Sequence, residues 1–387
     1  MRKDIVKKLI PIIALIPLVV LALTPPFTSR LDCTLNSLFW LYMVFFSGFL
    51  SLLYFHFKVN VFLKLFILWC FIGCFLSRAP YLCFTLFWSV IICAYYYLLC
   101  LQIEDFELVK KAIQSLFFFV TFLIIMQLLG FDTLLNFNHK DAVVLGTIGN
   151  YMILGSYICI LAPFLIRVSW LNWIPLILIA FISESTGTVF CIFAGLGVFI
   201  LGKYGKKLLK SIGGRFVIVF SVCVITLMIG LFAYKTHDLD SAVIKSGRLP
   251  VWQRTIKLVN EHPIGYGIAT YRLIFPLLSQ DLQSSKGANN AVWEYENTKG
   301  RGLAWRRAHN CFTQILFETG WIGFPLFMAF VGWIAWRVRK DPLALAGLTI
   351  IGMNMMIHFP SRMTQSVFIM IMFLAFCEAK EVAHERH

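Results

Sequence analysis

The sequence predicts an all-α, polytopic membrane protein with about twelve transmembrane helices and one long outer loop that contains short helices. Three observations predict this class: the apolar composition, a series of apolar runs, and the uneven placement of basic residues. Hydrophobic residues make up 59% of the 387 residues and charged residues only 14%, against roughly 45–50% and roughly 25% in an ordinary soluble domain. We therefore expect a single integral membrane domain over residues 1–387.

Each predicted span is an apolar run that ends near polar or charged residues. Helices are expected throughout, because lipid cannot satisfy exposed backbone groups and the runs are too long and too continuously apolar for barrel strands. The first run leads to Thr24-Pro25-Pro26 without a small-x-small cleavage site, so we interpret it as a span and not as a cleavable signal peptide. The runs cover residues 9–24, 35–57, 59–76, 81–101, 112–130, 144–166, 171–183, 186–202, 215–233, 310–336, 343–359 and 364–379.

The basic residues predict the orientation of these spans. A net charge of +15 would suggest nucleic-acid binding in a soluble protein, but in a membrane protein it first reports topology, and we expect no nucleic-acid partner. Nineteen of the 34 Lys and Arg residues fall in segments on the side of the two termini, and only Arg30, Arg78, Lys140 and Arg362 fall in short loops on the other side. Both termini are therefore expected in the cytoplasm and residues 234–309 outside.

The eleven cysteines lie mostly inside apolar runs, where they can pack as small hydrophobic side chains, as at Cys70, Cys74, Cys159 and Cys191. No C-x-x-C motif occurs, and no Cys/His cluster has the spacing of a zinc site. We expect neither a metal site nor a redox motif.

The long outer segment, residues 234–309, contains the other eleven basic residues. A loop of this length with so many charged side chains is expected to be functional and not a simple connection. An amphipathic helix at the membrane interface is predicted in its first half. Gln280–Lys299, rich in Ser, Asn, Gly and Gln, is predicted to be the flexible part. The apolar positions of the expected helix are Leu249, Val251, Trp252, Ile256, Leu258 and Val259.

Two stretches at the ends of this segment give the clearest chemical signals. SGRLPVWQRTIKLVNEHPIGYG places Arg248 and Arg254 near a short helix that ends at a His-Pro and a Gly-x-Gly turn. In RRAHNCFTQILFETGWIGF, basic residues stand just before an apolar helix that Asn310 is expected to cap. Those basic residues are Arg306, Arg307 and His309.

The pairing of GRLPVWQRTIKLVNEHPIGYG with AHNCFTQILFETGWIGF resembles the O-antigen ligase and O-antigen polymerase superfamily. The resemblance extends more weakly to GTIGNYMILGSYICILAPF and to the layout of twelve spans with one long loop. It implies a membrane-type glycosyltransferase that moves a glycan from undecaprenyl pyrophosphate to an acceptor at the periplasmic face of the bacterial inner membrane. It implies no nucleotide sugar, metal or other cofactor. The implied acceptor is lipid A-core for a ligase, our first choice, or a second lipid-linked glycan for a polymerase.

Motif matching gives roles to two residues of this sequence, Arg248 and His309. An arginine fork can grip pyrophosphate oxygens bidentately, and the start of the helix after His309 adds backbone N–H groups. Histidine suits a base that deprotonates the acceptor hydroxyl, because its unperturbed pKa of about 6.5 leaves much of it neutral at neutral pH. Further substrate-binding residues are expected at Arg254, Arg272, Arg306, Arg307, Asn310, Glu184 and Glu318.

One departure from the family concerns the turn between two middle spans. Family ligases often have a Ser-Arg-Gly-like turn there, whereas this chain has SESTG at residues 183–187, with Glu184 in place of the arginine. A second pyrophosphate-binding arginine is therefore missing from that turn. Arg272, Arg306 and Arg307 are its candidate replacements.

Several site residues also have a simpler interpretation, and His309 can be an ordinary polar residue that precedes a helix. The outer arginines can bind lipid headgroups at the interface, His262 before Pro263 can be structural, and Glu318 can make a contact inside its span or orient a basic group. If His309 is not the base, Glu184, Glu318 and His262 are the next candidates.

Two alternatives concern the class of protein. Asp238 and Asp240 have the form of a metal-binding pair of nucleotide-sugar transferases, but such donors are not expected outside the membrane. A transporter of lipid-linked sugar would show internal repeats and ionisable residues deep in broken helices. Neither feature is clear in this sequence.

Overall fold

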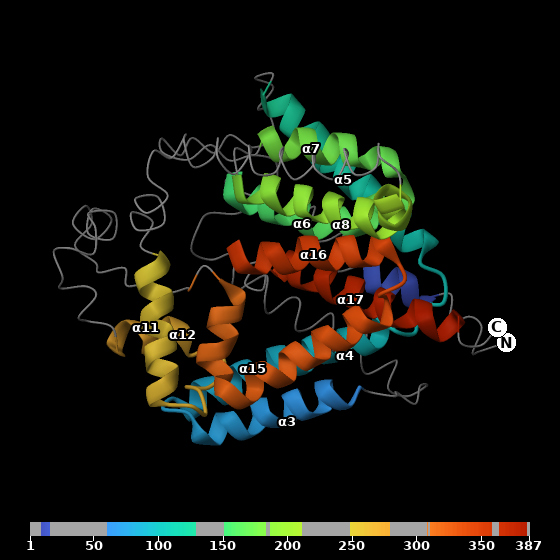
Figure 1. The fold of residues 1–387 in the computed structure, drawn as a ribbon. Helices are drawn as coiled ribbons and strands as arrows, with labels where there is room; N and C mark the ends of the chain where they lie inside the picture. Colours follow the sequence, from blue (N-terminus) through green and yellow to red (C-terminus); the bar gives the residue numbers. More distant parts are fainter. Residues whose placement is uncertain are drawn as a thin grey trace. The chain divides into compact units, whose positions relative to one another are not determined.

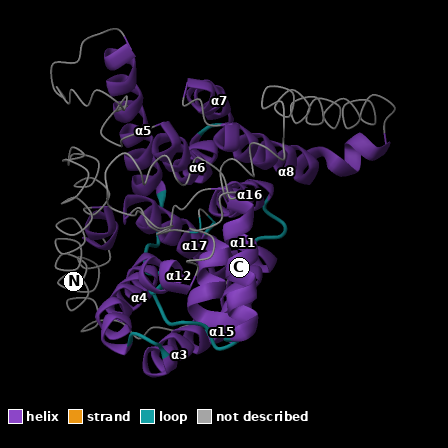
Figure 2. Ribbon diagram, turned by 90° about the vertical axis from the view of Figure 1, so that its left-hand side faces the viewer, coloured by secondary structure: helices purple, strands orange, loops and turns teal. Residues whose placement is uncertain are grey.

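The structure is a computed structural model that describes residues 9–15, 60–128, 151–182, 186–210, 248–278, 308, 310–357 and 364–384. All regular elements in these residues are helices, and Figure 2 shows no strand in the described part of the chain. The all-α class predicted from the sequence is confirmed. The predicted spans at 35–57 and 215–233 and the loop Gln280–Lys299 lie outside the described residues, so the count of twelve spans stays a prediction.

The helices follow the predicted apolar runs closely. Four of them are long and apolar enough to cross a membrane, namely Pro80–Cys100, Glu107–Met126, Gly187–Gly205 and Cys311–Arg337, and five shorter apolar helices accompany them among the described residues. The helix predicted from residue 112 begins earlier, at Glu107, where the Asp105 carboxylate accepts a hydrogen bond from the Glu107 backbone N–H at 2.8 Å. Together with the sequence, these helices indicate a multi-pass membrane protein.

The described helices fall into two compact units, shown together in Figure 1. Unit 1 comprises residues 1–59, 91–203 and 332–387, and unit 2 comprises residues 60–90 and 204–331. The helices α4 (Pro80–Cys100), α8 (Thr186–Lys210) and α15 (Cys311–Arg337) run across the boundaries between these ranges. The single integral domain predicted from the sequence stays a prediction.

In unit 1, α6 (Tyr151–Val168) packs against α5 (Glu107–Leu128), α7 (Trp173–Ile182), α16 (Pro342–Ile357) and α17 (Thr364–His384). The residues of α6 from Leu154 to Ile166 are almost completely buried. A helix that is apolar all round its surface belongs in the centre of a bundle. Unit 1 also contains the 3₁₀ turn Trp170–Asn172, most of α8 (Thr186–Lys210), the second half of α4, the end of α15 and the helical residues 9–15.

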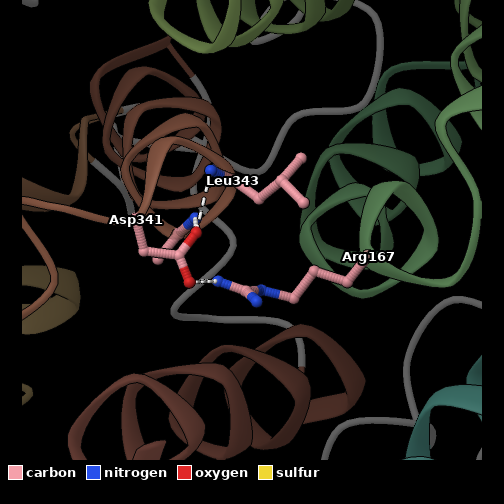
Figure 3. A network of polar contacts seen from close by, with 4 residues as sticks. Arg167, Asp341 and Leu343 are labelled. Carbon is pink, nitrogen blue, oxygen red and sulfur yellow. Dashed lines mark hydrogen bonds and ion pairs between the residues drawn. The ribbon is translucent and has the colours of Figure 1, made fainter. Parts of the chain in front are cut away.

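A polar network joins α6 to α16 within unit 1 (Figure 3). The Arg167 guanidinium donates to Asp341 Oδ2 at 2.6 Å and lies over the Phe376 ring. The other oxygen of Asp341 accepts from the backbone N–H of Leu343 at 3.0 Å and so caps α16. One carboxylate therefore both starts a helix and neutralises a buried cation.

Unit 2 contains α3 (Val61–Leu76), the first half of α4 (Pro80–Cys100), α11 (Arg248–Glu261), α12 (Tyr271–Leu278) and the first part of α15 (Cys311–Arg337). Asn60 caps α3 by accepting from the Phe62 backbone N–H at 2.8 Å. Helix α11 confirms the helix predicted in the long loop. Helix α12 was not predicted individually.

Helix α3 shows how this unit can meet lipid. Its buried side is formed by Leu63, Cys70 and Cys74, while a second row of large apolar side chains remains exposed. The exposed row follows a helical spacing of three and four residues, as expected of a helix face turned to an apolar solvent. Its members are Val61, Leu65, Leu68, Ile72 and Phe75.

Candidate functional site

The two stretches that gave the chemical signals in the sequence meet in one apolar core within unit 2. From α11, Val251, Leu258 and Val259 are buried in this core. As predicted, they form one face of the helix, but Ile256, which was expected on the same face, is 43% exposed. The other members of the core are Tyr266, Tyr271, Ile274, Phe275, Ala308, Leu316 and Phe317.

Helix α15 is interrupted at Gly320, which has φ 68° and ψ −169°. This backbone conformation is essentially restricted to glycine. A Cβ on Gly320 would lie 2.2 Å from the Pro263 carbonyl oxygen, so the two chain segments touch through their backbones. Gly265 has φ 87° and faces the same contact from the other side, since its Cβ would lie 2.5 Å from the Gly320 nitrogen.

Three backbone hydrogen bonds join the turn at residues 262–267 to the interruption in α15. They replace helical bonds that the break at Gly320 removes, so both segments keep their backbone groups paired. The Trp69 indole N–H of α3 donates to the Thr319 carbonyl at 2.8 Å and adds a contact from a third helix. The three backbone bonds are Tyr266 N to Phe317 O at 3.0 Å, Gly267 N to Glu318 O at 2.9 Å, and Trp321 N to Pro263 O at 2.8 Å.

The residues on either side of position 309 are both held by hydrogen bonds. Ala308 is buried, and its carbonyl accepts from the indole N–H of Trp252 in α11 at 2.7 Å. Asn310 is also buried, and its Oδ1 accepts from the Thr313 backbone N–H at 3.0 Å. The cap predicted for α15 is therefore confirmed at Asn310.

Arg254 has a structural contact that the sequence did not indicate. Its guanidinium donates to the carbonyl of Leu278, the last residue of α12, at 2.6 Å. A cation at a helix C-terminus is favourable because it satisfies a free carbonyl and opposes the helix dipole. This contact favours a structural role for Arg254 over phosphate binding.

Glu318 and His262 also have partners in the folded unit. Glu318 accepts from the Gln314 side-chain amide at 2.8 Å, one turn earlier on α15. The His262 ring stacks on Tyr266 with centroids 4.8 Å apart, and Tyr266 stacks on Phe317 at 4.5 Å. These contacts favour the internal polar contact for Glu318 and the structural interpretation for His262.

Two buried tyrosines support the same core. Burial raises the pKa of the Tyr271 phenol well above its ordinary value, while a hydrogen bond to Thr255 works against this shift. Burial also raises the pKa of Tyr266, and the Arg78 guanidinium beside its ring opposes that rise. Both phenols stay protonated at neutral pH, which suits packing and hydrogen-bond donation and not proton abstraction.

Two residues near this core were missed by the reasoning from sequence. Trp252 was predicted only as part of an apolar face, and its bond to Ala308 joins residues 56 positions apart. Arg78 was counted only as a short-loop cation, yet its guanidinium lies 5.6 Å from the centre of the Tyr266 ring. For Trp252 the available signal was an indole N–H donor on a predicted apolar face, which usually finds a hydrogen-bond partner when it is buried. No signal was available for Arg78.

Several predicted site residues lie outside the described residues: Glu184, Arg306, Arg307 and His309, the pair Asp238 and Asp240, and the side chains of Arg248 and Arg272. Of Arg248 and Arg272, the structure describes the backbone. Arg248 is the first residue of α11, and Arg272 is the second residue of α12.

A comparison with protein families concerns the middle of the chain, with residues from both units. Residues 171–328 match the family model described as O-antigen ligase. The match begins in the 3₁₀ turn Trp170–Asn172 and ends within α15, and it includes α11, the turn at residues 262–267 and position 309. It confirms the resemblance to the O-antigen ligase superfamily and supports a glycosyltransferase-like function of the ligase or polymerase type. No curated protein matches the chain.

Proposed function

We propose that the protein transfers a glycan from undecaprenyl pyrophosphate to an acceptor hydroxyl at the periplasmic face of the inner membrane, with lipid A-core as the acceptor. One observation supports this most directly. Within the segment that matches the O-antigen ligase family, the residues on both sides of His309 are fixed, and one of them is bonded to α11, the helix that begins at Arg248.

The proposed reaction is a single displacement at the anomeric carbon of the donor glycan. The acceptor oxygen forms a bond to that carbon as the bond to the pyrophosphate oxygen breaks, which inverts the configuration. The leaving undecaprenyl pyrophosphate keeps the electron pair, and His309 takes the proton of the acceptor hydroxyl. General-base catalysis of this kind typically contributes about 10²–10⁴-fold to the rate.

In this proposal, arginines hold the charge of the leaving group. Arg248 grips the pyrophosphate oxygens through its planar fork, and Arg272, Arg306 and Arg307 are the candidates for a second cation. Cations fixed where negative charge develops lower the barrier without a metal ion. Arg254 is the weakest candidate, because its guanidinium already donates to Leu278.

The decisive experiment is reconstitution of the purified protein with a defined undecaprenyl-pyrophosphate-linked glycan. One reaction receives lipid A-core, and a second receives only further lipid-linked glycan. Glycosylated lipid A-core is the expected product, and activity is expected to persist in a chelator. Chain extension without lipid A-core would assign the polymerase reaction instead. Movement of the donor across a sealed vesicle without any new glycosidic bond would contradict both and support a transporter.

A further inference from the structure

We infer that Trp252 is a positioning residue, which holds the backbone before His309 against α11 so that the proposed base keeps its place relative to the helix that begins at Arg248. This inference rests on the proposed function. In this inference, Trp252 acts through the backbone of Ala308 and does not itself touch the substrate.

The first step of the argument is the bond itself. The Trp252 indole N–H donates to the Ala308 carbonyl at 2.7 Å, and Ala308 is fully buried. Trp252 lies four residues, about one helical turn, after Arg248. One hydrogen bond therefore joins α11, one turn after its start, to the residue immediately before His309.

The second step is that this bond has a counterpart on the other side of His309. Asn310 is fixed to α15 by its cap on Thr313, and the Gln314 backbone N–H donates to the Asn310 carbonyl at 3.1 Å. Consecutive Cα atoms are 3.8 Å apart. Residue 309 is thus bounded by two anchored neighbours, one held by α11 and the other by α15.

The third step is that the fold does not depend on the Trp252 bond alone. The two segments are also joined by the apolar core and by a second indole bond, from Trp321 to Asn260 Oδ1 at 3.0 Å. Loss of the Trp252 N–H should leave the unit folded and release only the chain next to His309. Because misplacement of a catalytic group by about 1 Å can cost about 10²-fold in rate, this release should be visible in turnover.

The test compares Trp252→Phe with Trp321→Phe. Both replacements keep an aromatic ring and remove an indole N–H that joins the α11 segment to the α15 segment, but only the first bond lies beside position 309. For Trp252→Phe we expect turnover to fall by about 10- to 100-fold, with donor binding and thermal stability in detergent close to those of the unsubstituted protein. Trp321→Phe should retain near-normal turnover.

A double-mutant cycle separates positioning from a general structural effect. If Trp252 acts through His309, Trp252→Phe should have almost no further effect on the residual activity of His309→Ala. Full additivity in that background, or equal losses in Trp252→Phe and Trp321→Phe, would overturn the inference. If His309→Ala itself keeps normal turnover, the proposed function fails, which is a different result from failure of the role of Trp252.

Discussion

Hydrogen bonds at Ala308 and Asn310 hold the chain on both sides of the proposed base by different means. The carbonyl of Ala308 is bound by a side chain from α11, and the side chain of Asn310 binds the first turn of α15. Such support from neighbouring groups is what a catalytic side chain requires, since its own geometry must be held within about 0.5 Å.

His309→Ala is expected to abolish transfer while the protein stays folded and binds the lipid-linked donor. The reason is that donor binding needs apolar surface for the polyprenyl chain and cations for the pyrophosphate, whereas the base acts on the acceptor. Turnover should fall by about 10²–10⁴-fold at saturating donor. In the unsubstituted protein, activity should fall as the pH drops through the histidine pKa, because protonated imidazole cannot accept a proton.

Poor donor binding by His309→Ala together with normal turnover at saturation would contradict the role of base. His309 would then be a phosphate ligand or a structural residue, and the base would have to be sought at Glu184, Glu318 or His262.

Arg248→Lys is expected to lose nearly as much activity as Arg248→Ala. A lysine ammonium is a point charge and cannot reproduce the two parallel hydrogen bonds of a guanidinium to phosphate oxygens. Turnover and donor binding should be measured for both variants, with Arg339→Lys on the predicted cytoplasmic side as the control. Substantial activity in Arg248→Lys would instead support headgroup binding or a simple ion pair.

At the scale of elements, the break in α15 joins two separate segments of unit 2 through their backbones. Gly320 adopts a conformation that other residues avoid, and the Pro263 carbonyl occupies the space where a side chain would begin. The turn at residues 262–267 and the break therefore define each other's shape.

Gly320→Ala is expected to destabilise the protein by more than about 1 kcal/mol, because it combines an unfavourable φ with a backbone clash. Gly332→Ala is the matched control in the same helix, since its Cβ would meet no atom within 4 Å. The loss of monodisperse protein on heating in detergent measures both effects. Equal thermal stability of the two variants would show that the break can relax without cost.

The helices were largely predictable, but the break and α12 were not. Long apolar runs with charged ends predict membrane spans without any tertiary information. Asn310 before Cys311 is a preferred N-cap residue, so the start of α15 was also predictable. The predicted span at 310–336 continues through Gly320 without interruption, and the carbonyl that pairs with the opened helix, that of Pro263, lies 57 residues before Gly320 in the chain. Helix α12 has only eight residues and contains Pro276, so it gives too little periodicity for recognition.

For the same reason, the candidate site was only partly predictable. Residue types and helix starts were readable locally, whereas the partners of Arg254, Trp252 and Arg78 depend on tertiary contacts.

At the scale of the whole molecule, orientation decides whether the site faces the periplasm. The charge distribution predicts that residues 203–210 are cytoplasmic and residues 280–299 periplasmic. In cells with an intact inner membrane, a membrane-impermeant thiol reagent should label Ser285→Cys but not Lys206→Cys. The unsubstituted protein gives the background from its own cysteines. Labelling of Ser285→Cys only after permeabilisation of the inner membrane would overturn the topology and the proposed periplasmic reaction.

Because residues 262–267 pair with residues 317–321, both stretches must be exchanged together in a chimera with a related protein. Each of the three backbone hydrogen bonds has its donor in one stretch and its acceptor in the other. Gly265 of the first stretch and Gly320 of the second lie in direct backbone contact. A chimera that replaces only one stretch would combine a turn and a break that were shaped for different partners. Engineering of acceptor choice should therefore transplant the α11 segment and the start of α15 as one cassette.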